Sequence, residues 1–289
     1  MNHPAHALEL TASTQVVAVI GHPVRHSLSP LIHNAGFAAS GLDWAYVALD
    51  VAEGDGTQAV EAARTLGFRG LSVTMPHKAA AARAVDELSP TAAALGAVNC
   101  VTNRQGHLVG DNTDGAGFVR SLQAEVGFEA FGRRCVVFGA GGAARAIVLA
   151  LAMAGAGEIT VVNRTVARAE AAVALAPDVT RIGTADAVAG ADLVVNATPL
   201  GMAGVSVGPP DAPTSIPMSE LGPGQVVADL VYHPARTELM ARAEAGGATV
   251  VGGLGMLVHQ AALAFTLWTG VAAPLAAMQE AAAAGLRNS

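Results

Sequence analysis

The sequence predicts an α/β protein built from two domains. Short apolar runs bounded by glycine or proline alternate along the chain with Ala-rich segments of helical length, which is the pattern of βαβ units. At 289 residues, the chain exceeds the usual size of a single hydrophobic core. A glycine cluster also follows one of the apolar runs directly and opens an Ala/Leu-rich segment. Because strands alternate with helices throughout, both domains are expected to be α/β.

The first part of the chain contains four expected strands and four expected helices. Proline in the first turn marks the start of the first helix, and Gly67 closes the second. We expect strands at Val16–Ile20, Trp44–Leu49, Gly70–Thr74 and Ala97–Thr102, and helices at about Pro30–Ala39, Glu53–Leu66, Ala79–Leu88 and, briefly, from Ser89-Pro90. A hairpin-like turn at Asn103–Gly106 then leads to Gly110–Asp114.

A dinucleotide-binding βαβ unit is predicted between Arg133 and Arg168. Cys135–Phe138 is a buried strand, Arg145–Met153 a helix and Ile159–Val162 a second strand. Between the first strand and the helix stands the cluster Gly139-Ala140-Gly141-Gly142-Ala143-Ala144. Its glycines permit a tight turn and a close approach of pyrophosphate to backbone N–H groups at the helix N-terminus. The implied ligand is an adenine dinucleotide.

The tip of the second strand indicates which dinucleotide is bound. An NAD site usually carries Asp or Glu there, where it accepts a hydrogen bond from the ribose 2′-OH. This tip instead offers Asn163, Arg164, Thr165 and, slightly later, Arg168. Guanidinium groups bind phosphate through two parallel hydrogen bonds, so the tip favours the 2′-phosphate of NADP. The alternative is that Arg164 and Arg168 are merely solvated.

The division into domains follows from these elements. We expect residues 1–114 to form a substrate-binding catalytic domain, completed by C-terminal helices in 252–289, and residues 115–251 to form a doubly wound Rossmann-type NADP domain. The Pro-rich stretch Gly208–Pro217 is expected to be a surface connection. The segment from Ala245 to Met278 has no charged residue, but its glycines leave only Met256–Thr269 as a helix. At 1.5 Å per residue such a helix is too short for a bilayer.

Composition narrows the choice of partners. A net charge of −7 argues against nucleic acid, and any anionic ligand must be held by a local site. The two cysteines, Cys100 and Cys135, are too few for a disulfide framework and fit a reducing compartment. The N-terminus lacks the pattern of a signal peptide. We therefore expect a cytoplasmic protein that has no membrane contact, whether monomer or homodimer.

Lys78 and Asp114 are the candidate proton-transfer pair. Lys78 stands at the start of a helix, where a cation faces the positive end of the helix dipole, a placement that favours function over stability. Asp114 closes the run Gly110–Asp114 just before a helix expected at Gly115–Glu125, and helix capping would by itself explain an aspartate there. A carboxylate that orients an ammonium group is nonetheless a plausible acid/base unit.

Taken in order, the motifs resemble the shikimate dehydrogenase family over roughly residues 15–275. The motifs that carry the resemblance are Ser27-Leu28-Ser29-Pro30, the run Ser72 to Lys78, Gly96-Ala97-Val98-Asn99, Gly110–Asp114, Gly139–Ala144, Asn163-Arg164-Thr165, Asn196-Ala197-Thr198-Pro199 and the run Gly253 to Gln260. The resemblance implies NADP-dependent, reversible hydride transfer between 3-dehydroshikimate and shikimate, a step of aromatic amino-acid biosynthesis.

The resemblance also implies roles for individual residues. Lys78 and Asp114 would be the catalytic pair. Ser27 and Ser29 would bind the substrate carboxylate, and Tyr232 would lie near the substrate. The ring hydroxyls would be held by Thr74, Asn99, Asp114 and Gln260. The cofactor would be bound by Gly139, Ala140, Gly141, Gly142, Ala143, Asn163, Arg164, Thr165, Arg168, Thr198 and Gly253, with Gly253 at the nicotinamide end.

Two positions depart from the family pattern. Ser72 stands where many members have asparagine, and His77 stands where others have an aromatic residue or glycine. We expect His77 to be solvated or to serve the helix start, and His259 to be packed. Instead of binding the substrate, the side-chain amide of Gln260 could equally form its hydrogen bonds with the protein backbone. The histidines, cysteines and aspartates do not have metal-ligand spacing, so no metal is expected.

Three functions therefore stay open. An NADP-dependent shikimate dehydrogenase is favoured. A quinate or aminoshikimate dehydrogenase of the same family would keep the Lys–Asp pair and change the ring contacts. A non-catalytic NADP-sensing protein would keep the second domain but need not keep Lys78 and Asp114, and their joint presence disfavours it.

Overall fold

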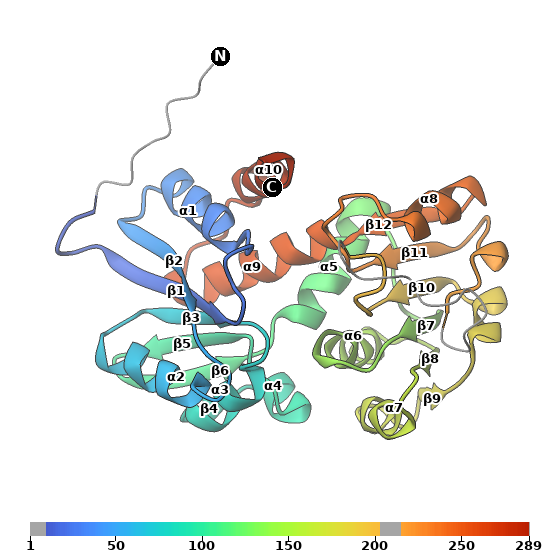
Figure 1. Ribbon diagram of the computed structural model, residues 1–289, viewed down its shortest axis with the longest axis horizontal. Helices are drawn as coiled ribbons and strands as arrows, with labels where there is room; N and C mark the ends of the chain where they lie inside the picture. The colour runs from blue at the N-terminus through green and yellow to red at the C-terminus, as the bar shows by residue number, and fades with distance from the viewer. Residues whose placement is uncertain (1–9, 203–214, 289) are drawn as a thin grey trace, which may run out of the picture. The chain divides into compact units, whose positions relative to one another are not determined.

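The computed structural model describes residues 10–202 and 215–288, which form a mixed α/β structure (Figure 1). The chain divides into two compact units. The first contains the chain up to Asn112 together with Ala261–Gly285, and the second contains Thr113–Gln260 together with the residues from Leu286. The chain thus leaves the first unit next to the crossing expected at Asp114, and it returns at Ala261 rather than at residue 252.

The first unit is built on a six-stranded sheet of mixed direction, with strand order β2-β1-β3-β5-β6-β4. Strands β1, β2 and β3 are parallel, whereas β5 runs antiparallel to both β3 and β6. Gln105 and Gly106, both at positive φ, close the β5–β6 hairpin at the expected turn. The strands are β1 (Gln15–Gly21), β2 (Trp44–Asp50), β3 (Gly70–Val73), β4 (Glu87–Leu88), β5 (Cys100–Arg104) and β6 (His107–Asp111).

Helices pack onto this sheet and bury an aliphatic core. Side chains of α2, α3 and α4 pack against β1, β3, β5 and β6 around residues such as Ile20, Val60 and Leu71. Phe37 of α1 meets Phe265 of α9 with ring centroids 5.3 Å apart. The helices are α1 (Ser29–Ala39), α2 (Gly56–Thr65), α3 (Lys78–Ala84), α4 (Pro90–Leu95), the end of α9 (Gly253–Thr269) and α10 (Leu275–Asn288).

One expected helix was too long. The segment predicted as helical to Leu88 leaves the helix after Ala84, and Glu87–Leu88 forms β4 beside β6. Asp86 explains the change, because its carboxylate accepts hydrogen bonds from Arg64 and from the Leu108 N–H at the sheet edge. Pairing with β6 overrides the helical propensity of the segment.

The second unit contains a fully parallel six-stranded sheet in the order β12-β11-β10-β7-β8-β9. This is the doubly wound order of a Rossmann-type fold, and the chain reverses its direction of progress between β7 and β10. The fold class predicted from the sequence is therefore confirmed. The strands are β7 (Arg134–Phe138), β8 (Glu158–Val162), β9 (Thr180–Ile182), β10 (Leu193–Asn196), β11 (Val226–Asp229) and β12 (Thr249–Gly252).

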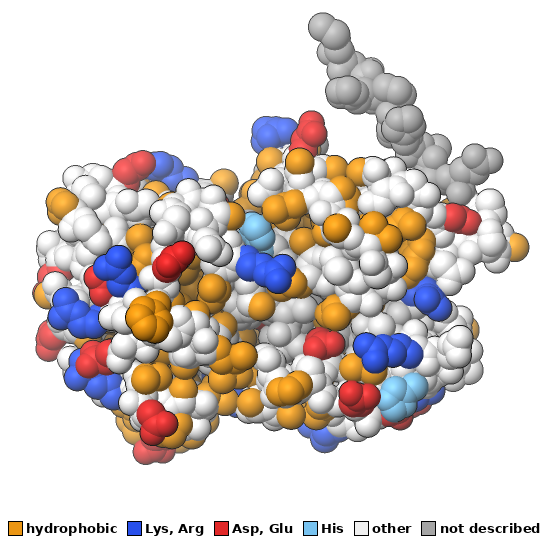
Figure 2. Space-filling model, turned by 180° about the vertical axis from the view of Figure 1, so that it is seen from behind, with side chains coloured by type: hydrophobic (Ala, Val, Ile, Leu, Met, Phe, Trp, Pro, Cys, Tyr) orange, Lys and Arg blue, Asp and Glu red, His pale blue; other side chains and the backbone are white. Residues whose placement is uncertain are grey.

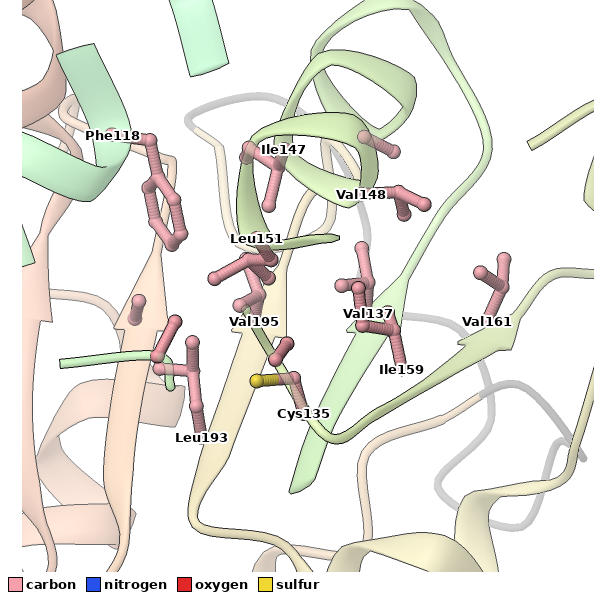
Figure 3. Close-up of a cluster of buried hydrophobic side chains, with 14 of the residues drawn as sticks. Phe118, Cys135, Val137, Ile147, Val148, Leu151, Ile159, Val161, Leu193 and Val195 are labelled. Atoms are coloured by element: carbon pink, nitrogen blue, oxygen red, sulfur yellow. The ribbon is translucent and has the colours of Figure 1, made fainter. Parts of the chain in front are cut away.

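Both faces of this sheet are covered. Phe118, Ile147 and Leu151 pack onto Val137, Ile159 and Val195 of the strands, as Figure 3 shows, and belong to the face covered by α5, α6 and α7. On the other face, Phe138 and Val194 pack against Leu239 of α8 and Val188 of η1. The helices are α5 (Asp114–Val126), α6 (Gly142–Met153), α7 (Val166–Val173), α8 (Glu238–Ala245) and the 3-10 turns η1 (Ala185–Gly190) and η2 (Met218–Glu220).

The uncharged segment near the C-terminus folds as expected, with one shift. Helix α9 begins at Gly253 rather than at Met256, so Gly253 and Gly255 lie inside it. In the described part of the chain, no helix is both long and apolar enough to cross a membrane. Of the Pro-rich stretch Gly208–Pro217, residues 208–214 lie outside the described residues. Figure 2 shows acidic and basic side chains interspersed over one face of the molecule.

Candidate active site

Polar residues gather at one edge of the first unit's sheet. Thr74 directly follows β3, Lys78 is the first residue of α3, and Asn99 directly precedes β5. Because β3 and β5 are antiparallel, with Ser72 opposite Cys100, the end of β3 and the start of β5 lie at the same edge. Ser27 lies in the loop after β1, which is parallel to β3 and ends at this edge as well.

Backbone contacts hold this edge together. The Thr74 N–H donates to Ile20 O at 2.9 Å, and a Cβ on Gly21 would lie 2.3 Å from Thr74 Cγ2, so only glycine fits there. Asn99 O accepts from the Val73 N–H at 2.7 Å, while the Asn99 N–H donates to Asp111 O at 3.0 Å. These bonds tie the predicted ring-binding residues Thr74 and Asn99 to the sheet.

The two serines lie at the start of α1. Ser29 is its first residue and is buried, and its N–H donates to Ser27 Oγ at 3.3 Å. Tyr46, on β2, is a neighbour that the sequence reasoning missed. Burial raises the pKa of its hydroxyl, which lies near Ser72 and Ser29 but has no hydrogen-bond partner among the described residues. Nothing in the local sequence around Tyr46 indicates this contact.

Lys78 lies half-buried at the N-terminus of α3, as expected. Its carbonyl accepts from the Val98 N–H at 3.0 Å. His77 occupies the position before the helix and is buried, with its Nε2 2.8 Å from Val51 O. His77 thus stands at the helix start as expected, but its side chain forms no cap there and is not solvated.

Asp114 is buried in the second unit and is the first residue of α5. The position before the helix belongs to Thr113, so the capping role considered for Asp114 is wrong. Lys78 belongs to the first unit, and the pairing of the two side chains stays a prediction.

The second unit places an open helix N-terminus where its strand order reverses. Gly139 follows β7 at φ +111°, and a Cβ there would lie 2.9 Å from Ala197 O. A Cβ on Gly141 or Gly142 would instead meet open space, and within residues 10–202 and 215–288 no side chain caps α6. The helix begins at Gly142 rather than at Arg145 as expected, which brings Gly142 and Ala143 into its first turn. Unsatisfied N–H groups and open space beside the glycines suit a pyrophosphate.

The tip of β8 is basic, as predicted. Asn163 Nδ2 donates to Thr165 O at 2.9 Å and closes the turn into α7. Arg164 and Arg168 are exposed, and neither forms an ion pair with any acidic group in the described ranges. Two unpaired guanidinium groups beside a dinucleotide-binding helix fit a phosphate group on the ribose.

A buried polar network, which sequence reasoning missed, joins β10 to β11. Thr198 Oγ1 donates to Asn196 Oδ1 at 2.6 Å, and Asn196 Nδ2 donates to Asp229 Oδ1 at 2.9 Å. The other oxygen of Asp229 accepts from Thr237 Oγ1 at 2.6 Å. Burial raises the pKa of Asp229, and hydrogen bonds from Thr237, Val231 and Asn196 oppose the shift. The network fixes the loops that carry Thr198 and Tyr232.

Of the remaining predicted residues, Tyr232 and Gly253 follow β11 and β12, and Gln260 lies within α9. Burial raises the pKa of Tyr232, which is half-buried. A Cβ on Gly253 would lie 2.1 Å from Leu230 O, so glycine is required for the approach of the two loops. Gln260 Nε2 donates to Leu257 O at 2.8 Å, which matches the alternative that the backbone satisfies this amide. Burial and the nearby Arg120 charge lower the pKa of His259, which is packed as expected.

Among the described residues, no group of three or more His, Cys, Asp or Glu side chains could hold a metal ion. Both cysteines are free and buried.

Comparisons with known proteins agree with this architecture. Three families match: shikimate dehydrogenase substrate binding domain at residues 19–101, shikimate/quinate 5-dehydrogenase at 123–200, and shikimate 5′-dehydrogenase C-terminal domain at 253–283. The shikimate dehydrogenase (NADP(+)) of Moorella thermoacetica is 50% identical over 281 residues, covering 94% of this chain and 93% of that protein.

Solved structures give the same result. Shikimate 5-dehydrogenase from Thermus thermophilus, in complex with NADP(H) and shikimate, has a TM-score of 0.86 and 39% identity, over 94% of this chain and 100% of that one. Quinate dehydrogenase from Corynebacterium glutamicum, in complex with NAD, has a TM-score of 0.84 and 33% identity, over 93% and 98%. This chain belongs to the shikimate dehydrogenase family.

Proposed function

We propose that this protein is an NADP-dependent shikimate dehydrogenase that interconverts shikimate and 3-dehydroshikimate. The observation that carries the proposal is the polar edge of the first unit, where Ser27, Thr74, Lys78 and Asn99 follow or precede neighbouring strands. This edge lies within the segment that matches the substrate-binding family.

The residues of the second unit fit the dinucleotide. The open N-terminus of α6 offers backbone N–H donors to the pyrophosphate, with Gly139, Ala140, Gly141, Gly142 and Ala143 around it. Asn163, Arg164, Thr165 and Arg168 would hold the adenosine 2′-phosphate, while Thr198 and Gly253 would border the nicotinamide end. When bound, NADP⁺ supplies the hydride acceptor.

The chain's own groups would orient the substrate and handle its proton. The Ser27 and Ser29 hydroxyls would donate to the carboxylate, with Tyr232 beside it. Thr74, Asn99, Asp114 and Gln260 would hold the ring hydroxyls. In the oxidising direction, the Lys78 amine would accept the proton of the reacting hydroxyl as its carbon gives up a hydride, and Asp114 would stabilise the resulting ammonium.

We propose a cytoplasmic enzyme of aromatic amino-acid biosynthesis that acts as a monomer or homodimer and binds neither nucleic acid nor membrane.

The decisive experiment measures absorbance at 340 nm with shikimate or quinate crossed against NADP⁺ or NAD⁺. We expect the highest kcat/KM with shikimate and NADP⁺. A higher kcat/KM with quinate would instead indicate a quinate dehydrogenase, like the similar structure from Corynebacterium glutamicum. Binding of NADP⁺ without turnover of either substrate or of an aminated analogue would indicate a sensor.

A further inference from the structure

A cavity opens at the end of the first unit's sheet opposite to Thr74 and Lys78. It has a volume of about 330 Å³ and is lined by Arg69, Thr102, Asn103, Arg104, Gln105, Leu267 and Trp268. Arg69 precedes β3, whereas Thr74 follows it, and Thr102 lies opposite Gly70 in the register. At about 3.3 Å per strand residue, roughly 15 Å of sheet separates this cavity from Thr74.

The cavity is cationic in a chain that carries a net charge of −7. Two of its lining residues are arginines and none is acidic. Neither Arg69 nor Arg104 forms an ion pair with a carboxylate of residues 10–202 or 215–288, although Arg64 in the same unit pairs with both Glu61 and Asp86. The Arg69 guanidinium instead lies over the Trp44 ring, 5.8 Å from its centroid. Two guanidinium groups thus keep their capacity to bind an oxyanion.

A buried hydroxyl in the wall adds a further hydrogen-bonding group. Thr102 is 7% exposed, and its Oγ1 is buried with no hydrogen-bond partner within the described structure. A buried hydroxyl that is left unpaired destabilises the fold, so such groups usually have a partner. Thr102 also lines the cavity, so a rotation of its side chain would bring the hydroxyl to a ligand that accepts its hydrogen bond.

The other wall is apolar, and a hydrogen bond holds its indole ring against the sheet. The Trp268 indole N–H donates to Val101 O at 2.9 Å, and a Cβ on Gly70 would lie 2.2 Å from the indole nitrogen. Glycine at this position is therefore what lets the indole reach the strand. Leu267, 40% exposed, extends the apolar surface beside it. A ligand with an anionic head and an apolar or ring-shaped body matches both walls.

We propose that this cavity is a second ligand site, which binds a small organic oxyanion through Arg69, Arg104 and Thr102 and packs its body on Trp268. The cavity volume falls in the range of small-molecule sites. The inference does not depend on the reaction that the protein catalyses, because the cavity shares no residue with the proposed active site.

Tryptophan fluorescence can test the site directly. The chain has only two tryptophans, Trp44 against Arg69 and Trp268 in the cavity wall. We would titrate the full-length protein with phenyl phosphate, benzoate and inorganic phosphate at constant ionic strength, exciting at 295 nm. We expect a saturable change in fluorescence with phenyl phosphate or benzoate at millimolar concentrations or below. Inorganic phosphate should bind more weakly, because it has no ring to pack on Trp268.

Variants distinguish anion binding in this cavity from anion binding elsewhere on the protein. Arg69→Gln and Arg104→Gln should each weaken binding by about tenfold or more, and Thr102→Val by severalfold. Arg83→Gln removes an exposed arginine of the same unit and should leave the affinity unchanged. Ser27→Ala/Ser29→Ala should also leave it unchanged, since those serines belong to the proposed active site.

Other outcomes would overturn the proposal. One is the absence of a saturable fluorescence change with either organic anion. Another is that Arg83→Gln weakens binding as much as Arg104→Gln does. Loss of binding in the double serine variant alone would assign the signal to the active site. Arg104 lies in an exposed hairpin, so its variant keeps the test valid if Arg69→Gln fails to fold.

Discussion

At the residue scale, Lys78 carries the chemical part of the proposal. Lys78→Ala should lower kcat by roughly 10²–10⁴-fold, because that is the usual contribution of a positioned acid/base. The dissociation constant for NADP⁺ should stay within about twofold, since the cofactor residues lie in the other unit. Steady-state kinetics and a binding titration check both. Arg83→Ala, in the last turn of the same helix, is the matched control. Turnover within a few-fold of wild type would remove Lys78 from the mechanism.

Arg164 tests the choice of cofactor. The 2′-phosphate is the only chemical difference between NADP and NAD, so the preference must come from groups that touch it. Losing one charge-assisted contact of about 1.5–3 kcal/mol should weaken NADP binding roughly ten- to a hundred-fold in Arg164→Ala, with little change for NAD. Arg164→Asp should go further, because it repels the phosphate and offers the ribose hydroxyl an acceptor.

The measurement is the ratio of kcat/KM with NADP⁺ to kcat/KM with NAD⁺ in the wild type and both variants. Arg181→Ala, which removes an exposed arginine paired with Glu158, is the control for the loss of charge. A ratio that does not move in Arg164→Asp would show that the tip is solvated surface.

At the element scale, the β7–α6 turn uses its glycines for two different purposes. Gly139 has φ +111° and lies against Ala197 O, whereas Gly141 has φ −78° and faces open space. Gly139→Ala should therefore destabilise the fold by about 1–3 kcal/mol. Gly141→Ala should leave the melting temperature nearly unchanged and weaken NADP⁺ binding by about tenfold or more, because its Cβ enters the space expected for pyrophosphate.

Thermal unfolding and a binding titration on the two variants separate these effects. If Gly141→Ala binds NADP⁺ as tightly as the wild type does, the pyrophosphate does not approach this turn.

The elements also show where local signals suffice. Helix α6 was predicted from its glycine cluster and Ala/Leu pattern, with an error of one turn at its start. The β4 strand was missed because its two residues are held by β6 and by the Asp86 contacts, which come from elsewhere in the chain. Two residues are too few to show the alternation of apolar and polar side chains that identifies a strand in a sequence.

At the scale of the whole molecule, stability should fall below neutral pH because of His33. Burial among aromatic rings lowers its pKa to about 3, and its ring stacks on Tyr46 with centroids 4.4 Å apart. The unfolded chain takes up a proton near pH 6.5, which the folded chain excludes. The stabilisation is therefore complete above about pH 6.5 and is lost as the pH falls towards 3.

Urea unfolding at pH 7.5 and pH 5.0 measures this effect. His33 should account for up to about 2 kcal/mol of the loss, at about 1.4 kcal/mol per pH unit. His33→Phe should show a smaller loss between the two pH values, whatever its stability at pH 7.5. Equal losses in wild type and His33→Phe would contradict the argument.

Residue order is enough to predict the α/β class, the doubly wound second unit, the helix start that suits a dinucleotide and the acid-free strand tip at Asn163-Arg164-Thr165. These features depend on spacing within a few residues, where hydrophobic period, glycine and capping residues act directly. The family motifs add the identity of Lys78, Asp114 and the substrate residues.

Other features arise only when distant segments pack. The Asn196–Asp229–Thr237 network joins residues from β10, β11 and the start of α8, and His77 meets Val51 O across a loop. The proposed oxyanion cavity brings Arg69 and Thr102 beside Trp268 from the far end of the sequence. Local sequence patterns do not predict such neighbours. Whether their hydrogen bonds and charges find partners depends on the strand register and the burial that the tertiary fold imposes.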